Sequence, residues 1–561
     1  MPTDGKQSPY AFIYRILNAK FGGLRRQLKL MKKLIFLLTL AALTSLATHA
    51  DVAINSTNFP DDNFRNYLLS RYPDGRLTDS DIASCKTLDV RGLNIASLTG
   101  VKYFTAITKL DCYSNPNLTT IDGIQSCKAL EEIMADNCGL TSLDVTGLNN
   151  LAVLRLRNNK LTTFSVSGLS QLYYLRLSGN SLLTQVYCPD NDLTTLDVTE
   201  CFGLQTLICN NNPRLTSVTG LIGDTKITHL ECNNCALWDV DATLKQLKKL
   251  EYLSIGNNSF AKLEIAYMPN LHYLSVAGST QLTELYANEN GISTLDVSGC
   301  TALNILDCSG NPLGSIDVSK CTALTELFCI NSQLTSIDVS HNAALVTLKC
   351  PNNQLTSLDV KSNLHLQSLI CENNLLTSLD VAGLPELAII YCENNLLTSM
   401  NVQYCQELFS IWCYGNQLTT IDLSKTPGIL DLRLHRNYIN GAGMDDLVNS
   451  LPARPDDQTG TIFVRDKDDN NVINPAQLAT AKAKNWKVLY YRTPGWYYMP
   501  DYFVGDVDQD GLVGIADVTS LIDLLLVSDT SCSDHAAADL DGDNNISIAD
   551  VTTLIDSLLA E

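Results

Sequence analysis

Charge is scarce in this sequence, and positive charge is the scarcer kind. Only 18% of the 561 residues are charged whereas 45% are hydrophobic, so the chain has ample apolar material to bury and disorder is not expected. Residues 1–50 hold eight of the 39 basic residues and one of the 60 acidic ones, which leaves a net charge of −28 beyond them. A surface this acidic repels phosphate, so nucleic acid is excluded as a partner.

Sequence motifs for catalysis are missing as well. The seven histidines are scattered along the chain, and neither a nucleophile elbow nor a zinc-binding helix motif occurs. Most carboxylates fall at repeating positions, which indicates a solvated acidic stripe. We therefore predict a protein without enzymatic activity, although two carboxylates brought together by folding would escape such a search.

Long apolar runs are absent apart from one near the start. Leu34–Ala47 is apolar, follows Lys32 and Lys33, and is too short to cross a bilayer comfortably. The small residues Thr48 and Ala50 then stand three before and one before position 51, as at a signal-peptidase site. The sequence thus predicts an over-extended gene start at 1–30, a signal peptide at 31–50, and a secreted or cell-surface protein with no membrane span.

Cysteine, in contrast, is abundant, and its spacing argues against disulfide staples. The chain has nineteen cysteines, an odd number. Six of them recur every 21 residues, namely Cys308, Cys329, Cys350, Cys371, Cys392 and Cys413. Because cysteine is readily buried, we predict an inward-facing column of free thiols.

These cysteines mark a repeat with the frame L-x-x-L-x-L/C-x-x-N-x-L, as in LVTLKCPNNQLTSLDVKSNLH from Leu345. The frame resembles the short leucine-rich repeats of internalin-like bacterial proteins. The resemblance implies an α/β repeat fold, a leucine-rich repeat solenoid with a parallel β-sheet on its concave face. Two-residue alternation then places positions 4 and 6 of each unit in the core and turns positions 3, 5 and 7 outward.

Two segments of 11 residues, 172–182 and 271–281, interrupt the register of the repeats. Each is about half a unit, so it either loops out or exchanges the faces that the neighbouring strand halves occupy. We expect a local distortion of the coil without an exchange. The asparagines at position 9 are expected to be structural, because an amide donates to and accepts from backbone groups at a buried turn.

The segments that flank the repeats predict caps, because the open ends of a solenoid expose its core. Phe59–Leu69 has the pattern of an amphipathic helix, and helical and strand-like segments alternate beyond residue 441. Two prolines and a glycine then indicate a linker without regular structure. The predicted order is an N-terminal cap at 51–104, repeats at 105–440, a C-terminal cap at 441–492, a linker at 493–504 and a further domain at 505–561.

Residues 505–561 contain two acidic loops 33 residues apart, and each loop runs into an apolar helix. Alternate aspartates repel one another unless a hard cation gathers their oxygens, which indicates calcium. We predict two Ca²⁺ ions, one held by Asp506, Asp508, Asp510, Asp517 and the carbonyl of Leu512, the other by Asp539, Asp541, Asp543, Asp550 and the carbonyl of Asn545. The paired loop–helix units, with aspartate at position 12, resemble a small all-α dockerin type I module with EF-hand-like loops.

This dockerin resemblance implies a cohesin-like partner. In dockerins, loop positions 10 and 11 help to select the cohesin, and here both copies read Ile-Ala, as Ile515, Ala516, Ile548 and Ala549. A calcium-folded tail without a partner is the simpler alternative. Because dockerins often accompany polysaccharide hydrolases, the chain is alternatively a component of a cohesin–dockerin complex, either non-catalytic or with an unrecognised polysaccharide-degrading activity.

Outward positions of the unbroken units predict where a ligand binds. Aromatic and apolar side chains gather at positions 5 and 7, as Phe328, Ile370, Tyr391, Trp412 and Tyr414. A contiguous apolar cluster indicates a binding surface unless the C-terminal cap folds over it, and flat rings suit a protein hot spot or a sugar. We therefore predict a binding or adhesion protein that takes a protein or glycan ligand on the concave face and is attached through the dockerin-like module.

Overall fold

The computed structural model describes residues 51–221, 226–466, 469–492, 495–498, 505–508, 513–527, 536–541 and 545–560. The predicted gene start and signal peptide lie outside the described residues. Among the residues that are described, no helix is both long enough and apolar enough to cross a membrane.

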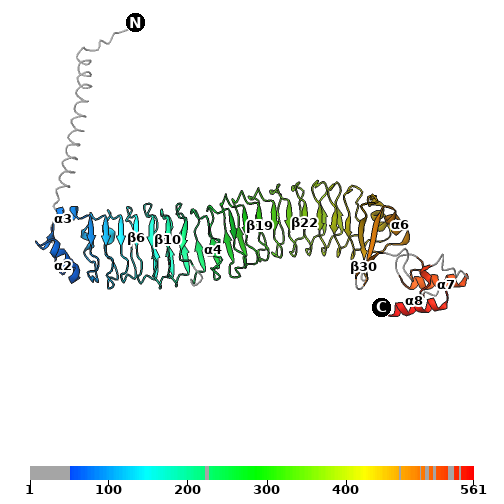
Figure 1. The fold of residues 1–561 in the computed structure, drawn as a ribbon, viewed down its shortest axis with the longest axis horizontal. Helices are drawn as coiled ribbons and strands as arrows, with labels where there is room; N and C mark the ends of the chain where they lie inside the picture. Colours follow the sequence, from blue (N-terminus) through cyan, green and yellow to red (C-terminus); the bar gives the residue numbers. More distant parts are fainter. Residues whose placement is uncertain are drawn as a thin grey trace, which may run out of the picture.

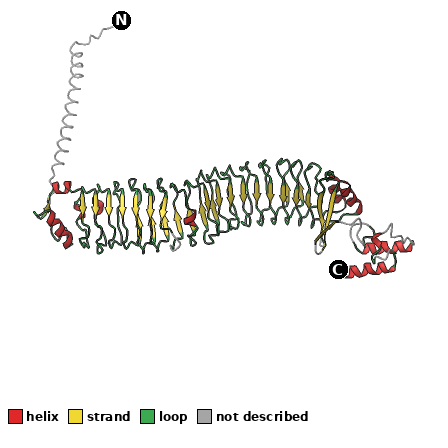
Figure 2. Ribbon diagram, viewed as in Figure 1, coloured by secondary structure: helices red, strands yellow, loops and turns green. Residues whose placement is uncertain are grey.

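The repeats form an elongated solenoid with strands on two faces (Figures 1 and 2). One face, called the long face below, begins with the parallel strands β3 (Thr87–Asp89), β4 (Lys109–Asp111), β5 (Glu132–Met134), β6 (Val153–Arg155), β8 (Tyr174–Arg176), β10 (Thr195–Asp197) and β12 (Ser217–Thr219). It continues, after the short helix α4 (Asp241–Leu244), with β15 (Lys262–Glu264), β17 (Glu284–Tyr286), β19 (Ile305–Asp307), β20 (Glu326–Phe328), β21 (Thr347–Lys349), β22 (Ser368–Ile370), β24 (Ile389–Tyr391), β26 (Ser410–Trp412) and β27 (Asp431–Arg433).

The opposite face of the solenoid holds a second parallel sheet. Its strands are β7 (Thr163–Ser165), β9 (Gln185–Tyr187), β11 (Thr206–Ile208), β13 (His229–Glu231), β14 (Tyr252–Ser254), β16 (Tyr273–Ser275) and β18 (Thr294–Asp296), and further along the chain β23 (Ser378–Asp380) pairs with β25 (Ser399–Asn401). These in-register parallel strands confirm the predicted fold class, a leucine-rich repeat solenoid.

The interior of the solenoid is filled by positions 4 and 6 of the units, as predicted. In the unit that starts at Leu345, Leu348 and Cys350 are fully buried, whereas Thr347 and Lys349 between them are half-exposed. The eighteen cysteines in the described part of the chain are free and buried. The column of thiols is therefore part of the core.

The position-9 asparagines satisfy backbone groups inside the coil, which confirms their structural role. Asn353 donates from Nδ2 to the carbonyl oxygens of Cys329 at 2.8 Å and of Cys350 at 2.9 Å. Its Oδ1 accepts from the amides of Ser332 at 2.9 Å and Leu334 at 3.0 Å. Nδ2 also donates to the Pro351 carbonyl at 3.1 Å, so one amide side chain bonds to five backbone groups at a buried turn.

The two half-units exchange faces, so our expectation of a local distortion is wrong. β8 comes from the first half-unit and lies on the long face between β6 and β10. After it, the strands that begin each repeat unit, β9, β11, β13 and β14, lie on the opposite face. β16, from the second half-unit, lies between β14 and β18, and first strands return to the long face from β17 onward. Asp197 consequently lies on the long face and Asp296 on the opposite one. Both strand halves bury a leucine in the same way, so either half fits either face.

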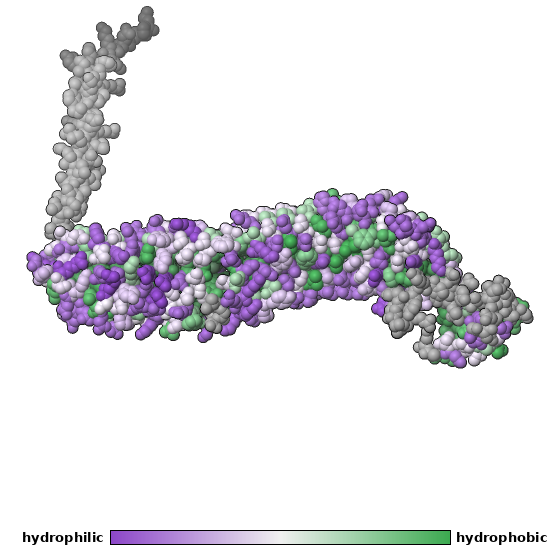
Figure 3. Space-filling model, viewed as in Figure 1, coloured by the Kyte–Doolittle hydropathy of each residue, from purple (hydrophilic) through white to green (hydrophobic). Residues whose placement is uncertain are grey.

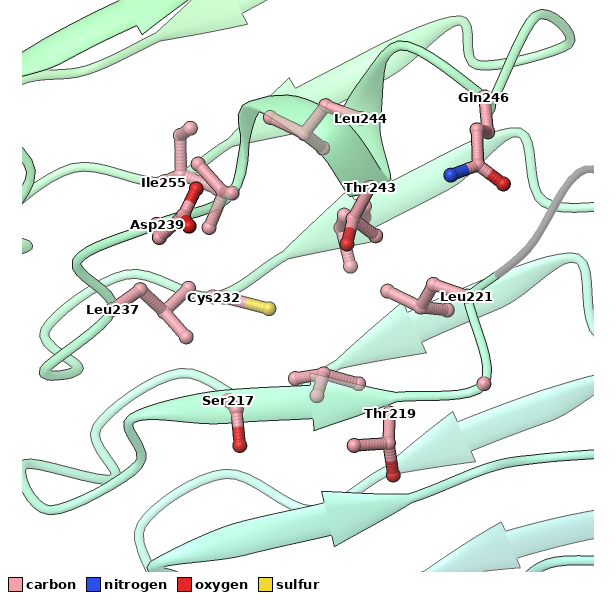
Figure 4. Close-up of a pocket in the computed structure, with 14 residues that line it drawn as sticks. Ser217, Thr219, Leu221, Cys232, Leu237, Asp239, Thr243, Leu244, Gln246 and Ile255 are labelled. Carbon is pink, nitrogen blue, oxygen red and sulfur yellow. The ribbon is translucent and has the colours of Figure 1, made fainter.

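A helix replaces one strand of the long face between the two exchanges. α4 occupies the place between β12 and β15, and the Glu264 amide donates to the Asp241 carboxylate at 3.2 Å across this interruption. Beside α4 lies a cavity of about 340 Å³, lined by apolar side chains such as Val218, Leu237 and Leu244 and by Cys232 (Figure 4). The sheet of the long face is therefore divided at this coil.

The N-terminal end of the solenoid is closed by a small cap. It contains β1 (Val52–Ala53), α2 (Asp62–Arg71), β2 (Arg76–Leu77) and α3 (Asp79–Ser84), and the short 3-10 helices η1 (Val101–Tyr103) and η2 (Ile124–Ser126) follow in the first coils. The predicted helix is confirmed as α2, which buries Phe64 and Leu68. Phe59 packs edge-on against Phe64 with ring centroids 5.7 Å apart, which seals the first coil.

The C-terminal cap extends the long face. α5 (Gly441–Ser450), β28 (Gly460–Arg465), α6 (Pro475–Ala483) and β29 (Trp486–Arg492) confirm the predicted helices and strands. The predicted absence of regular structure beyond 492 is wrong for 495–498, because β30 (Gly495–Tyr498) pairs antiparallel with β29. This pairing satisfies backbone groups along an edge strand that would otherwise be open, which outweighs the local preference of glycine for turns.

Candidate functional site

The C-terminal domain is built on two helices, α7 (Ile515–Leu526) and α8 (Ile548–Ala560). Its core is small and separate from that of the solenoid, and in the described part of the domain it consists of Val518, Leu521, Ala538, Ile546, Val551 and Leu554. The amide of Gly505 donates to the carbonyl of Ala537 at 2.7 Å and ties the two loops together. So little apolar burial gives the domain a marginal fold by itself.

The aspartate at position 12 organises each loop. Asp517 accepts from the amides of Val507 at 2.7 Å and Gly514 at 2.6 Å, one with each carboxylate oxygen. Asp550 does the same with Leu540 at 2.7 Å and Ser547 at 2.8 Å. These bonds anchor both ends of each loop at the start of its helix.

Carboxylates converge in both loops. Asp506, Asp508 and Asp517 each place an oxygen within 4.8 Å of the others, and so do Asp539, Asp541 and Asp550. Three hard oxygen donors this close to one another fit the ligand set of Ca²⁺. The structure describes Asn545 of the second loop, whereas Asp510, Leu512 and Asp543 lie outside the described residues. When bound, the ion would offset the mutual repulsion of these side chains.

The predicted cohesin-selecting residues lie at the first turns of α7 and α8. Ile515 is 84% exposed and Ile548 is 78% exposed, and Ala516 and Ala549 beside them are exposed too. Exposing an isoleucine side chain to water is unfavourable, so two exposed isoleucines at equivalent places indicate a contact surface. The two copies present matching surfaces.

An aromatic ladder crosses the C-terminal strands of the long face. Parallel register places Ile370, Tyr391, Trp412, Arg433 and Phe463 side by side on β22, β24, β26, β27 and β28. Figure 3 shows hydrophobic surface gathered on this part of the solenoid. The cap continues the ladder through Phe463. The side chains are half-buried, less exposed than predicted, because they pack on one another.

Both faces of the Trp412 indole are covered. Tyr391 stacks on one face, with ring centroids 4.2 Å apart and an interplanar angle of 20°. The Arg433 guanidinium lies 3.9 Å from the Trp412 ring centroid and 4.7 Å from that of Phe463. Trp412 Nε1 donates to Asp431 at 2.7 Å. The ladder thus presents ring edges, a tyrosine and a cation to solvent.

Phe328 and Tyr414 belong to neighbouring groups and not to the aromatic ladder itself. Lys349 stands between Phe328 and Ile370, and its Nζ lies 5.2 Å from the Phe328 ring centroid. Tyr414 stands at position 7 of its unit, in the column next to the position-5 side chains of the ladder. It stacks on His435, with ring centroids 4.4 Å apart. The single apolar patch expected from the sequence is therefore divided by charge.

Three titratable groups lie in the same column as Tyr414. Burial raises the pKa of Glu393 to about 7 and also raises the pKa of Glu372. Burial lowers the pKa of His435 to about 4. Near neutral pH this column therefore carries less charge than its sequence suggests.

Sequence reasoning missed a second aromatic ladder on the opposite face. His229, Tyr252 and Tyr273 stack with successive centroid distances of 4.2 Å and interplanar angles of 4° and 2°. His229 Nε2 lies 2.8 Å from Glu231. His229 and Tyr252 occupy position 3 of consecutive first strands and Tyr273 occupies position 3 of the second half-unit, and this shared position was the available signal. It was overlooked because the face exchange was not foreseen.

Comparisons with known proteins agree with this architecture. Residues 59–180 match the family described as the LRR domain of endo-beta-N-acetylglucosaminidase EndoS, and residues 504–559 match the dockerin type I domain family. No curated protein sequence matches the chain significantly.

Solved structures of other leucine-rich repeat proteins are similar to this chain. The functional domain of InlJ from Listeria monocytogenes, described as including a cysteine ladder, is 26% identical, with 77% of this chain and 87% of that chain covered and a TM-score of 0.24. A leucine-rich repeat protein from Leptospira interrogans is 19% identical over 70% of this chain and 98% of its own, with a TM-score of 0.31.

Proposed function

We propose that this leucine-rich repeat protein with a C-terminal dockerin type I domain is an exported, non-catalytic adhesion protein. The aromatic ladder of the long face takes a protein ligand. The C-terminal domain, folded around two calcium ions, fixes the chain to a cohesin-like partner. The predicted signal peptide and the usual extracellular place of dockerin-containing proteins support export.

The observation that carries the choice of ligand is the coverage of Trp412. A sugar ring stacks on a free aromatic face, and here Tyr391 and Arg433 occupy both faces of the indole. Tyrosine, tryptophan and arginine are the residues that dominate protein–protein hot spots. A protein partner is therefore favoured over a glycan.

The buried carboxylate Glu393 is the strongest argument for catalysis, since a pKa of about 7 suits a general acid or base. Its side chain is nonetheless only 7% exposed, and Oε2 is covered by protein. Tyr414 contacts the other oxygen at 3.5 Å. Inaccessibility to a substrate supports a packing role, in line with the proposed absence of enzymatic activity.

Binding to type I cohesin domains tests the attachment. In calcium, the full chain is expected to bind a cohesin from a panel, and EDTA is expected to abolish binding. Ile515→Asp with Ile548→Asp should weaken binding at least 100-fold, whereas either single variant retains it because the two surfaces match. Calorimetric titration measures both effects.

Leu526→Asp with Leu559→Asp is the matched double control, because these are also exposed apolar residues at equivalent places on α7 and α8, at 76% and 80%. It should bind like the unmodified chain. Lack of binding to every cohesin tested, or full affinity in the double isoleucine variant, would contradict the proposed attachment.

A further inference from the structure

Two core cysteines approach each other far more closely than packing requires. Cys209 follows β11 and Cys232 follows β13, and their Sγ atoms are 2.7 Å apart. Both side chains are buried, at 0% and 1% exposure. The Cys308 thiol, in contrast, points at backbone and lies 3.4 Å from the Phe328 carbonyl.

The backbone around this pair has the geometry that a disulfide needs. β11 and β13 are parallel neighbours in register, with Ile208 opposite Glu231, so Cys209 and Cys232 stand directly side by side. Neighbouring strands lie about 4.8 Å apart, which is within the range of Cα separations that disulfides span. Bond formation therefore requires rotation of side chains and no movement of strands.

A disulfide at this position would stabilise a weak point of the solenoid. The coil that contains Cys232 is the one in which α4 replaces a strand of the long face, and Cys232 lines the cavity beside α4 (Figure 4). Among the described residues, strand pairing links this coil to its neighbours on the opposite face and not on the long face. A covalent link between β11 and β13 would hold the two coils together where the other sheet is interrupted.

We propose that Cys209 and Cys232 form a disulfide when the chain folds in an oxidising compartment. Each thiol loses a proton, and their two electrons pass to an external disulfide, of the kind carried by thiol–disulfide oxidoreductases, which is reduced to two thiols as the new S–S bond forms. The bond forms before the core closes. Once the coil is folded, the contact with Cys232 and burial raise the pKa of the Cys209 thiol and suppress the reactive thiolate.

Cysteine mapping tests the proposal on the full chain without its signal peptide. The protein is refolded with oxidised glutathione, denatured at acidic pH and labelled with N-ethylmaleimide, so the result does not depend on export. All but two of the nineteen cysteines are expected to be labelled, and mass spectrometry should find Cys209 linked to Cys232.

Four single variants identify the partners. Cys209→Ala and Cys232→Ala should each leave every remaining cysteine labelled. Cys188→Ala and Cys235→Ala are matched controls from the same cluster, since Cys235 Sγ contacts the Cys209 carbonyl at 3.4 Å, and both should keep the crosslink. Complete labelling of the unmodified chain, or a crosslink that survives in Cys232→Ala, would overturn the proposal.

Discussion

Chelation of calcium is expected to unfold the C-terminal domain while the solenoid stays folded. Without a cation, three carboxylates whose oxygens lie within 4.8 Å of one another repel at neutral pH in each loop. Among the described residues, the apolar cluster that opposes this repulsion contains six buried side chains. Hydrogen exchange followed by mass spectrometry should show amides of α7 and α8 protected in calcium and exchanging within seconds in EDTA.

The solenoid supplies the internal control for this experiment. Amides of α5, which packs in the C-terminal cap, should exchange equally slowly in calcium and in EDTA. Asp517→Ala with Asp550→Ala should abolish protection of α7 and α8 even in calcium, because each aspartate anchors both ends of its loop. Equal protection of these helices with and without calcium would show that the domain folds without the ion.

Asn353→Ala is expected to destabilise the centre of the solenoid strongly. The substitution leaves the Cys329 carbonyl and the amides of Ser332 and Leu334 unpaired inside the coil, whereas the Cys350 carbonyl still accepts from Asn374 at 3.0 Å. Unpaired buried groups cost about 1–3 kcal/mol each, so a loss of about 3 kcal/mol or more follows. Stability in a repeat protein is largely a sum of local terms. Amide protection in β20, β21 and β22 should therefore fall about 100-fold.

Gln354→Ala is the matched control, because Gln354 is the next residue and its side chain is exposed. It should leave amide exchange in the same strands unchanged. Unchanged protection in Asn353→Ala would show that water replaces the amide and that the asparagine column is dispensable.

Much of the fold could be predicted because burial repeats along the chain. The leucine and cysteine positions of each unit set the alternation of the strands, and Phe64 with Leu68 marks the helix of the N-terminal cap. The spacing of the aspartates in the first acidic loop likewise predicts that Asp506, Asp508 and Asp517 lie close together. In each case the local sequence pattern and the overall fold place the same side chains in the same positions.

The face exchanges could not be predicted from such patterns. The strand in the second half of a unit, such as the one that ends at Asp197, buries its leucine as well as the strand in the first half does. Alternation therefore determines which side chains point inward, but it does not determine which face of the solenoid the strand occupies. The coverage of Trp412 by Arg433 was equally inaccessible. Position 5 predicted that both would face outward and be neighbours, but the stacking depends on side-chain conformations that spacing does not determine.

Capture of protein ligands by the long face is the most direct test of the proposed function. The full chain and its Tyr391→Ala, Trp412→Ala double variant are screened in parallel on an array of extracellular protein domains and on a glycan array. Tyr252→Ala with Tyr273→Ala is the matched control on the opposite face, and thermal unfolding confirms that each variant is folded. We predict that the unmodified chain and the control capture the same protein domains and that the long-face variant captures none. Capture that survives in a folded long-face variant, or binding to glycans alone, would contradict the account.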